Sequence, residues 1–104
     1  MPQFDVFRNP SADGEDGFPY VLVVQSDLLE HLNLRVVVPL VRAEVVDPPL
    51  PRLNPRFRVG GESVVMATTL IGGLPARTLR DPIGNLAERR DEIIGAIDML
   101  ITGV

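Results

Sequence analysis

Residues 85–102 read NLAERRDEIIGAIDMLIT, and this stretch gives the clearest structural signal in the chain. Its apolar residues recur at the three- and four-residue spacing of one helix face: Leu86, Ile93, Ile94, Ile97, Leu100 and Ile101. Asn85 is a favourable first cap, and Glu88 stands three residues later, where a capping box places an acid. Gly103 follows where a left-handed cap is usual. The sequence therefore predicts a C-terminal helix over residues 85–102.

Short strands are predicted before this helix. Apolar and β-branched runs mark them at residues 4–8, 20–25, 35–41, 56–59 and 63–69. Gly60-Gly61 joins the last two as a hairpin. Pro39 indicates a bulge or an edge, because proline donates no ladder hydrogen bond. We also expect residues 43–46 to continue the third strand and residues 76–79 to form a last short strand.

Turns separate these strands. Residues 9–19 and 47–55 are rich in turn-forming residues, and Gly72-Gly73 with Pro75 predicts a further break. Several short strands followed by one helix are typical of a compact antiparallel barrel or sheet with a terminal helix. We predict a mainly β, α+β fold in a single domain over residues 1–104.

Composition limits the function. The chain has 104 residues, a net charge of −4 and no cysteine, which excludes disulfides, thiolate metal sites and a cysteine nucleophile. Its cations are all arginine, and an acidic domain is a poor candidate for binding nucleic acid directly. The cluster of Arg52, Arg56 and Arg58 is interpreted as a solvated loop face. With neither a basic, apolar start nor a bilayer-length apolar run, we expect a cytoplasmic protein without a membrane span.

Candidate catalytic groups are sparse. His31 is the only histidine, no metal-ligand spacing is present, and no serine sits in a nucleophile elbow. Glu88, Asp91 and Glu92 are interpreted as a solvated helix face. The acids of the first loop, Asp13, Glu15 and Asp16, do not follow the EF-hand spacing. We therefore predict binding rather than catalysis, with neither a metal nor a cofactor.

We expect the apolar end of the predicted helix to be covered by a partner. Its apolar stripe reaches Ile101, and terminal residues fray unless they are docked. We expect Ile93 and Ile97 to pack onto the chain's own sheet. The other apolar residues predict a two-fold seam with a second copy, the dimer interface: Ile97, Met99, Leu100 and Ile101.

Several stretches, in this order along nearly the whole chain, resemble the CcdB family. They are QFDVF at 3–7, VVQSDLL at 23–29, RVVVPL at 35–40, VGGES at 59–63, MATT at 66–69 and RRDEIIGAID at 89–98. The resemblance implies an SH3-like antiparallel β-barrel with a small extra sheet and one long C-terminal α-helix. It also implies a homodimer built around the helices, in the bacterial cytoplasm.

The resemblance also implies a function. Members of this family are toxins that bind the DNA gyrase A subunit and trap the enzyme while its DNA is cleaved. A CcdA-like antitoxin neutralises the toxin, and the two together bind their shared operator, so the toxin reaches DNA only through its partner. The matching target-binding positions here are Thr102, Gly103, Val104, Ile101, Asp98 and Leu28. The matching antitoxin-binding positions are Asp13, Glu15, Asp16, Leu28, Leu29 and Glu30.

Two adjacent positions depart from the pattern. The gyrase-poisoning members end their helix with tryptophan, glycine and a β-branched residue, and the tryptophan stacks on a gyrase arginine. Thr102 stands at that position, and the chain contains no tryptophan. Ile101 also stands where an aromatic residue precedes the tryptophan. Truncating a central aromatic contact costs about 2–4 kcal/mol, or about 30-fold to 1,000-fold in affinity. Three hypotheses remain: a gyrase toxin with a changed contact, a toxin fold with another target, or a non-toxic antitoxin-binding or autoregulatory module.

Overall fold

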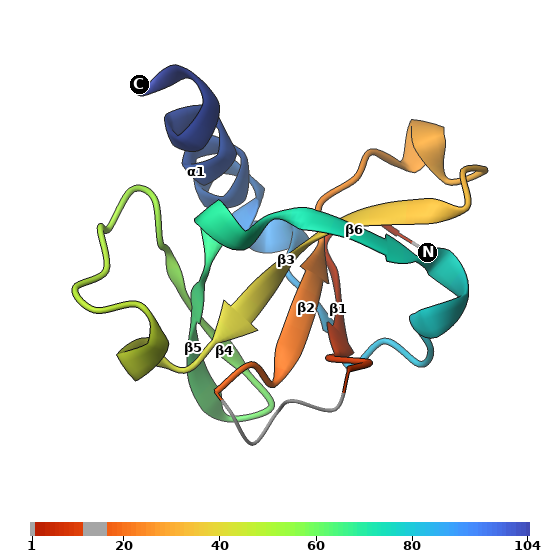
Figure 1. Ribbon diagram of the computed structural model, residues 1–104, viewed down its shortest axis with the longest axis horizontal. Helices are drawn as coiled ribbons and strands as arrows, with labels where there is room; N and C mark the ends of the chain where they lie inside the picture. Colours follow the sequence, from red (N-terminus) through yellow and green to blue (C-terminus); the bar gives the residue numbers. More distant parts are fainter. Residues whose placement is uncertain (1, 12–16) are drawn as a thin grey trace.

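The computed structural model describes residues 2–11 and 17–104. Figure 1 shows an antiparallel sheet curled into a nearly closed barrel, with one helix, α1 (Arg90–Thr102), standing out from one side. The strands are β1 (Asp5–Arg8), β2 (Tyr20–Val23), β3 (Leu34–Val41), β4 (Arg56–Val59), β5 (Glu62–Met66), β6 (Gly72–Pro75) and β7 (Gly84–Asn85). The predicted mainly β, α+β fold with a C-terminal helix is confirmed.

Strand β3 organises the sheet. The strand order is β4-β5-β3-β2-β1-β7, and β6 pairs with β3 outside this path. The first half of β3 pairs with β6, from Leu34 opposite Pro75 to Val37 opposite Gly72, whereas its last two residues pair with β5. Pro39 lies between these two ladders. Of the two predicted alternatives, a bulge or an edge, the edge was wrong, because β3 has partners on both sides. The missing donor of Pro39 is tolerated where β3 changes partners.

Three local predictions need correction, and one strand was missed. Gly72-Gly73 is part of strand β6 and not a break. Residues 76–79 contain a 3-10 turn, η5 (Ala76–Thr78), and residues 43–46 contain another, η3 (Ala43–Val45), so neither is a strand. The two-residue strand β7 was not predicted. In each case backbone pairing with a distant strand, or its absence, overrides the local residue preference.

The Gly60-Gly61 hairpin is confirmed. It joins β4 to β5, whose register places Val59 opposite Glu62. Both glycines have positive φ, +57° at Gly60 and +81° at Gly61, as a two-residue type I′ turn requires. The hairpin therefore continues the right-handed twist of its strands.

The helical segment begins differently from the prediction. Asn85 belongs to β7, and its side-chain oxygen accepts a hydrogen bond from the Ala87 N–H at 2.8 Å. A 3-10 turn, η6 (Ala87–Arg89), follows before α1 starts at Arg90. The capping box with Glu88 was wrong, because the helical turn η6 starts at Ala87 and has Leu86, not Asn85, at its cap position. Asn85 nevertheless receives the first N–H of the helical segment.

The core has two parts. The larger one fills the barrel beneath α1, which contributes the fully buried Ile93 and Ala96, while Ile97 packs against it half-buried. The smaller one lies on the other face of the sheet and combines Phe7, Val21, Val23, Val37 and Leu79. The prediction that Ile93 and Ile97 pack onto the chain's own sheet is confirmed. Packing of this kind fixes the start of α1 and leaves its last turn outside the barrel.

Candidate partner-binding surface

The last turn of α1 is closed by its own hydrogen bonds. The Thr102 hydroxyl donates to the Asp98 carbonyl at 2.7 Å and accepts from the Val104 N–H at 3.3 Å. Gly103 has φ +78°, and its N–H donates to the Met99 carbonyl at 3.0 Å. The predicted left-handed cap is confirmed. Thr102 thus satisfies backbone groups at the helix end, which a tryptophan side chain at this position would not do.

The same turn presents apolar surface to solvent. Ile101 is 73% exposed and Val104 is 75% exposed, and Asp98 and Thr102 are exposed as well. Figure 1 shows this end of α1 projecting away from the barrel. Burying an isoleucine or valine side chain is worth about 1.5–3 kcal/mol. A partner that covered this turn would gain that free energy at little ordering cost.

A second exposed apolar site lies on the turn η2 (Asp27–Leu29). Leu28 is 87% exposed, the highest value among the exposed large apolar side chains, and Leu29 is 45% exposed. The Ser26 hydroxyl accepts from the Leu28 N–H at 3.2 Å, and the Asp27 carboxylate accepts from the Gln3 N–H at 2.7 Å. The turn is therefore held in place while its leucines face water.

Arg35 holds the chain that follows this turn. Its guanidinium is buried and donates to the carbonyls of Glu30, Leu32 and Leu34. A buried guanidinium surrounded by carbonyl oxygens is held by charge-assisted hydrogen bonds, which are stronger than neutral ones. The sequence signal was a single arginine within the apolar run of residues 34–41, but its role depends on where the chain turns back.

The structure separates two groups of predicted target-binding residues. Asp98, Ile101, Thr102, Gly103 and Val104 form one surface at the end of α1, whereas Leu28 lies on η2, which Figure 1 places on another projection of the molecule. Leu28, Leu29 and Glu30 are neighbours and exposed. The other predicted antitoxin-binding residues, Asp13, Glu15 and Asp16, lie outside the described residues. A single chain thus has two separate exposed apolar surfaces, one at η2 and one at the end of α1.

The predicted seam residues differ in exposure. Met99 and Leu100 are half-buried, as is Ile97, while Ile101 is exposed. The helix passes beside the 3-10 turn η4 (Thr68–Leu70), whose Leu70 is 50% exposed. These side chains leave partly covered apolar surface along the second half of α1. An exposed apolar surface of this kind is a candidate for contact with another chain.

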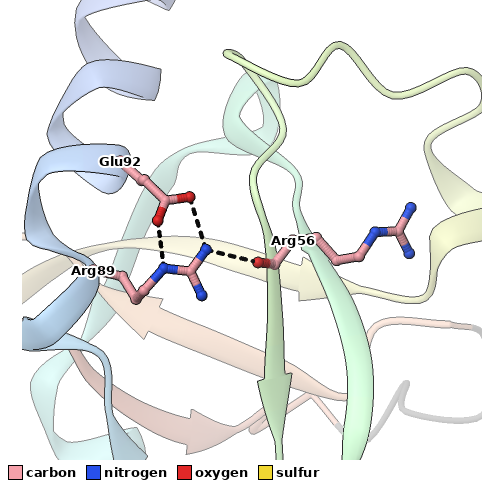
Figure 2. Close-up of polar contacts among 3 residues, drawn as sticks. All are labelled: Arg56, Arg89 and Glu92. Atoms are coloured by element: carbon pink, nitrogen blue, oxygen red, sulfur yellow. Dashed lines mark hydrogen bonds and ion pairs between the residues drawn. The ribbon is translucent and has the colours of Figure 1, made fainter.

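Arg89 joins the start of α1 to strand β4, as Figure 2 shows. Its Nε and Nη2 donate to the two carboxylate oxygens of Glu92, and Nη2 also donates to the Arg56 carbonyl at 3.2 Å. The guanidinium lies 4.8 Å from the ring centroid of Phe57. The hydrogen bonds from Arg89 lower the pKa of Glu92. The expectation that Glu92 is only solvated was wrong, although Glu88 and Asp91 are exposed.

Neither a metal site nor a membrane span is found in the described parts of the chain. No group of three histidine, cysteine, aspartate or glutamate side chains is arranged to hold a metal ion there. His31 is exposed in the turn after η2. Within residues 2–11 and 17–104, no helix has both the length and the apolar character needed to cross a bilayer.

One comparison with known proteins bears on these surfaces. The family model described as CcdB protein matches residues 3–103 of the 104-residue chain. The match includes Leu28 on η2 and the end of α1 as far as Gly103, and it stops one residue before Val104.

Proposed function

The chain belongs to the CcdB family, and from this premise we propose that it is the toxin of a type II toxin–antitoxin system that acts on the DNA gyrase A subunit. Family membership suggests a toxin of a toxin–antitoxin pair. The finer proposal is that the chain binds the A subunit and traps gyrase on cleaved DNA. It acts by binding and performs no catalysis itself.

The observation that carries the proposal is the exposed last turn of α1. Ile101 and Val104 face solvent there, and Gly103 keeps the left-handed turn that orients Val104. Thr102 takes no part in stacking. Its hydroxyl is engaged with Asp98 and Val104, so it orders the turn. The contact with gyrase therefore relies on apolar burial of Ile101 and Val104, with Asp98 as the polar neighbour.

A homodimer completes this surface. We propose that Met99 and Leu100 meet their copies across a two-fold axis and that Ile101 borders this seam with its outer side open to gyrase, while Ile97 stays mainly with its own core. Two copies of the last turn then lie side by side and offer one larger apolar patch. This arrangement compensates for the small size of the contact that one chain presents, because each single site buries little area.

We further propose that a CcdA-like antitoxin binds over the η2 turn. Leu28, Leu29 and Glu30 supply an exposed apolar pair with an acid beside it. Asp13, Glu15 and Asp16 complete the predicted antitoxin contact. Because Leu28 belongs to both predicted contacts, antitoxin and gyrase compete for it. Operator DNA is bound by the antitoxin and not by this acidic chain.

The second candidate is a CcdB-fold protein without gyrase poisoning. The observation that favours it is the position of Thr102, whose side chain is already engaged within the helix and offers no aromatic ring. In that case the chain acts on a different target, or it serves as a non-toxic module for antitoxin binding and autoregulation.

Direct binding separates the two candidates. We expect purified gyrase A subunit to bind the wild-type chain in calorimetry, and Ile101→Arg and Leu28→Arg each to weaken binding by about tenfold or more, because each places a charge in an apolar contact. Ile83→Arg, an exposed apolar position near β7, is the control and leaves the affinity unchanged. If the wild-type chain shows no affinity, or if all three variants bind equally well, the gyrase proposal fails.

A further inference from the structure

Strand β4 leaves one edge of the barrel open. It is one end of the strand order and β7 is the other, so these two edges do not pair with each other. A hollow of about 490 Å³ lies between β4 and the segment after β7, and its lining includes Arg56, Phe57, Arg58, Leu86, Glu88 and Arg89. The open edge therefore faces a space and not another strand.

The hydrogen-bond pattern between β4 and β5 shows which backbone N–H and C=O groups of β4 face this space. The Met66 N–H donates to the Pro55 carbonyl at 2.9 Å. Bonded pairs alternate along an antiparallel ladder, so Phe57 and Val59 also bond to β5, while Arg56 and Arg58 turn their backbone groups outward. Figure 2 shows the Arg56 carbonyl pointing to Arg89.

Three outward backbone groups of β4 have no partner. Arg56 N–H, Arg58 N–H and Arg58 C=O make no hydrogen bond to any residue in the part of the chain that the structure describes. An unpaired row of this kind is a template for an added strand. The fourth outward group, the Arg56 carbonyl, accepts a hydrogen bond from Arg89. The free edge therefore ends at Arg56.

The side chains beside this edge are basic. Arg56 and Arg58 are exposed on the outer face, while Phe57 and Val59 point into the core. The Arg58 guanidinium donates to the Gly61 carbonyl at 2.7 Å, which keeps it near the strand. Arg89 also lines the hollow but is paired with Glu92, so Arg56 and Arg58 face one carboxylate of the lining, Glu88. The hollow is thus locally positive on a chain whose net charge is −4.

We propose that the β4 edge binds an extended segment of a partner protein in which acidic side chains alternate with apolar ones. The segment adds as a strand and bonds to the outward groups of Arg56 and Arg58. Its acids lie opposite these two arginines, where cross-strand ion pairs form, and its apolar side chains enter the hollow beside Phe57 and Leu86. A second copy does not fit, because pairing two β4 edges would set arginine against arginine. The inference stands whether or not gyrase is the target.

Synthetic peptides test this proposal with the full chain. The probe is an eight-residue peptide that alternates valine with glutamate, and the reference peptide alternates valine with lysine. We expect fluorescence anisotropy to show binding of the glutamate peptide only, and its affinity to fall steeply as salt is raised. The paired change Arg56→Glu with Arg58→Glu weakens binding by about tenfold or more. The matched pair Arg77→Glu with Arg80→Glu, at exposed sites elsewhere, leaves it unchanged.

Amide exchange distinguishes strand addition from loose charge attraction. Binding should slow exchange at the Arg58 amide, which is unpaired in the free protein, and leave the Phe57 amide, already bonded to β5, as it was. Arg56→Gln with Arg58→Gln removes the charge with less risk to folding, and it should weaken binding in the same direction. The proposal is overturned if the glutamate peptide does not bind, if it binds the paired variants as tightly as the wild type, or if the Arg58 amide gains no protection.

Discussion

Thr102 decides how the end of α1 meets a partner. Its hydroxyl bonds to the Asp98 carbonyl and the Val104 N–H, so the side chain lies along the helix instead of reaching outward. In related gyrase poisons the resemblance places a stacking tryptophan here. The backbone turn at Gly103 is nevertheless kept, with φ +78°. The replacements at Thr102 and Ile101 therefore change the side chains of this surface and leave its backbone turn in place.

Restoring the aromatic residue should strengthen target binding. We expect Thr102→Trp to raise the affinity for the gyrase A subunit by about 30-fold or more, because the ring regains the stacked contact. Loss of the Thr102 hydrogen bonds costs little at an exposed site. Thr69→Trp, at another exposed threonine, controls for non-specific binding by a surface tryptophan and should leave the affinity for gyrase unchanged. Equal affinities of Thr102→Trp and the wild type in calorimetry would show that this turn does not touch gyrase.

Residues were predictable where their role is local. The left-handed conformation of Gly103 follows from a glycine placed just after an apolar helical stripe. Locality alone was not enough, however. Arg35 was missed although its three carbonyl partners lie within five residues, because no side-chain pattern marks the turn that directs those carbonyls toward it. The Arg89–Glu92 pair has an i,i+3 spacing that the sequence contains, whereas the hydrogen bond from Arg89 to the Arg56 carbonyl spans 33 residues and could not be predicted.

At the scale of elements, the Arg89–Glu92 pair fastens α1 to strand β4. Arg89 bonds to the carboxylate on the first turn of the helix and to the Arg56 carbonyl on the strand (Figure 2). Its hydrogen bond is the main cause that lowers the pKa of Glu92. A lowered pKa in the folded state stabilises the protein above the unfolded value, and this stabilisation is lost as pH falls through the folded pKa.

The contribution of Glu92 should therefore disappear in acid. We expect Glu92→Gln to lower the free energy of unfolding near pH 7 by a few tenths to about 1 kcal/mol, because the pair is half-exposed. The difference between the variant and the wild type should begin to shrink below the ordinary glutamate pKa of 4.5 and vanish below the lowered pKa of folded Glu92. Asp91→Asn changes another acid in the first turn of the helix, one without an ion pair to any residue that the structure describes, so it isolates the effect of Arg89. Denaturant unfolding at several pH values measures all three, and a difference that grows in acid would contradict the assignment.

Elements were predictable where side-chain patterns are strong. The hairpin around Gly60-Gly61 and the stripe of α1 have the periodicity of their structures. Strands β6 and β7 lack such a pattern, since they read Gly-Gly-Leu-Pro and Gly-Asn. They become strands because β6 pairs with β3 and β7 pairs with β1. These partners are distant in the sequence, so the local residues do not predict the pairing.

At the scale of the whole molecule, α1 has one face for the barrel and another for a partner. Ile93 and Ala96 are buried in the core, while Met99 and Leu100 are only half-covered and Ile101 is exposed. A small domain has limited core area of its own, so association is a natural way to cover such a face. The mainly β class and the C-terminal helix followed from sequence, but which face stays open depends on how far α1 extends past the barrel.

Dimerisation should depend on that open face. We expect sedimentation equilibrium to give a mass of twice 11.4 kDa for the wild type at micromolar concentration. Leu100→Arg should shift the protein to monomer, because a half-buried leucine at the proposed seam is replaced by a charge. Ile83→Arg tests whether any surface arginine has this effect and should remain a dimer. A wild type that sediments as a monomer, or a Leu100→Arg variant that stays dimeric, contradicts the proposed seam.

The most direct test is a DNA-cleavage assay with purified host gyrase. We expect the wild-type chain to accumulate cleaved DNA, and Gly103→Arg to abolish this effect while the protein stays folded. A Cβ at Gly103 meets no atom within 4 Å, but φ +78° strains any other residue and reorients Val104. Gly84→Arg, an equally open site with ordinary φ, should behave as wild type. If the wild-type chain leaves gyrase unaffected at high concentration, the fold has been kept without the target, and the gyrase proposal is wrong.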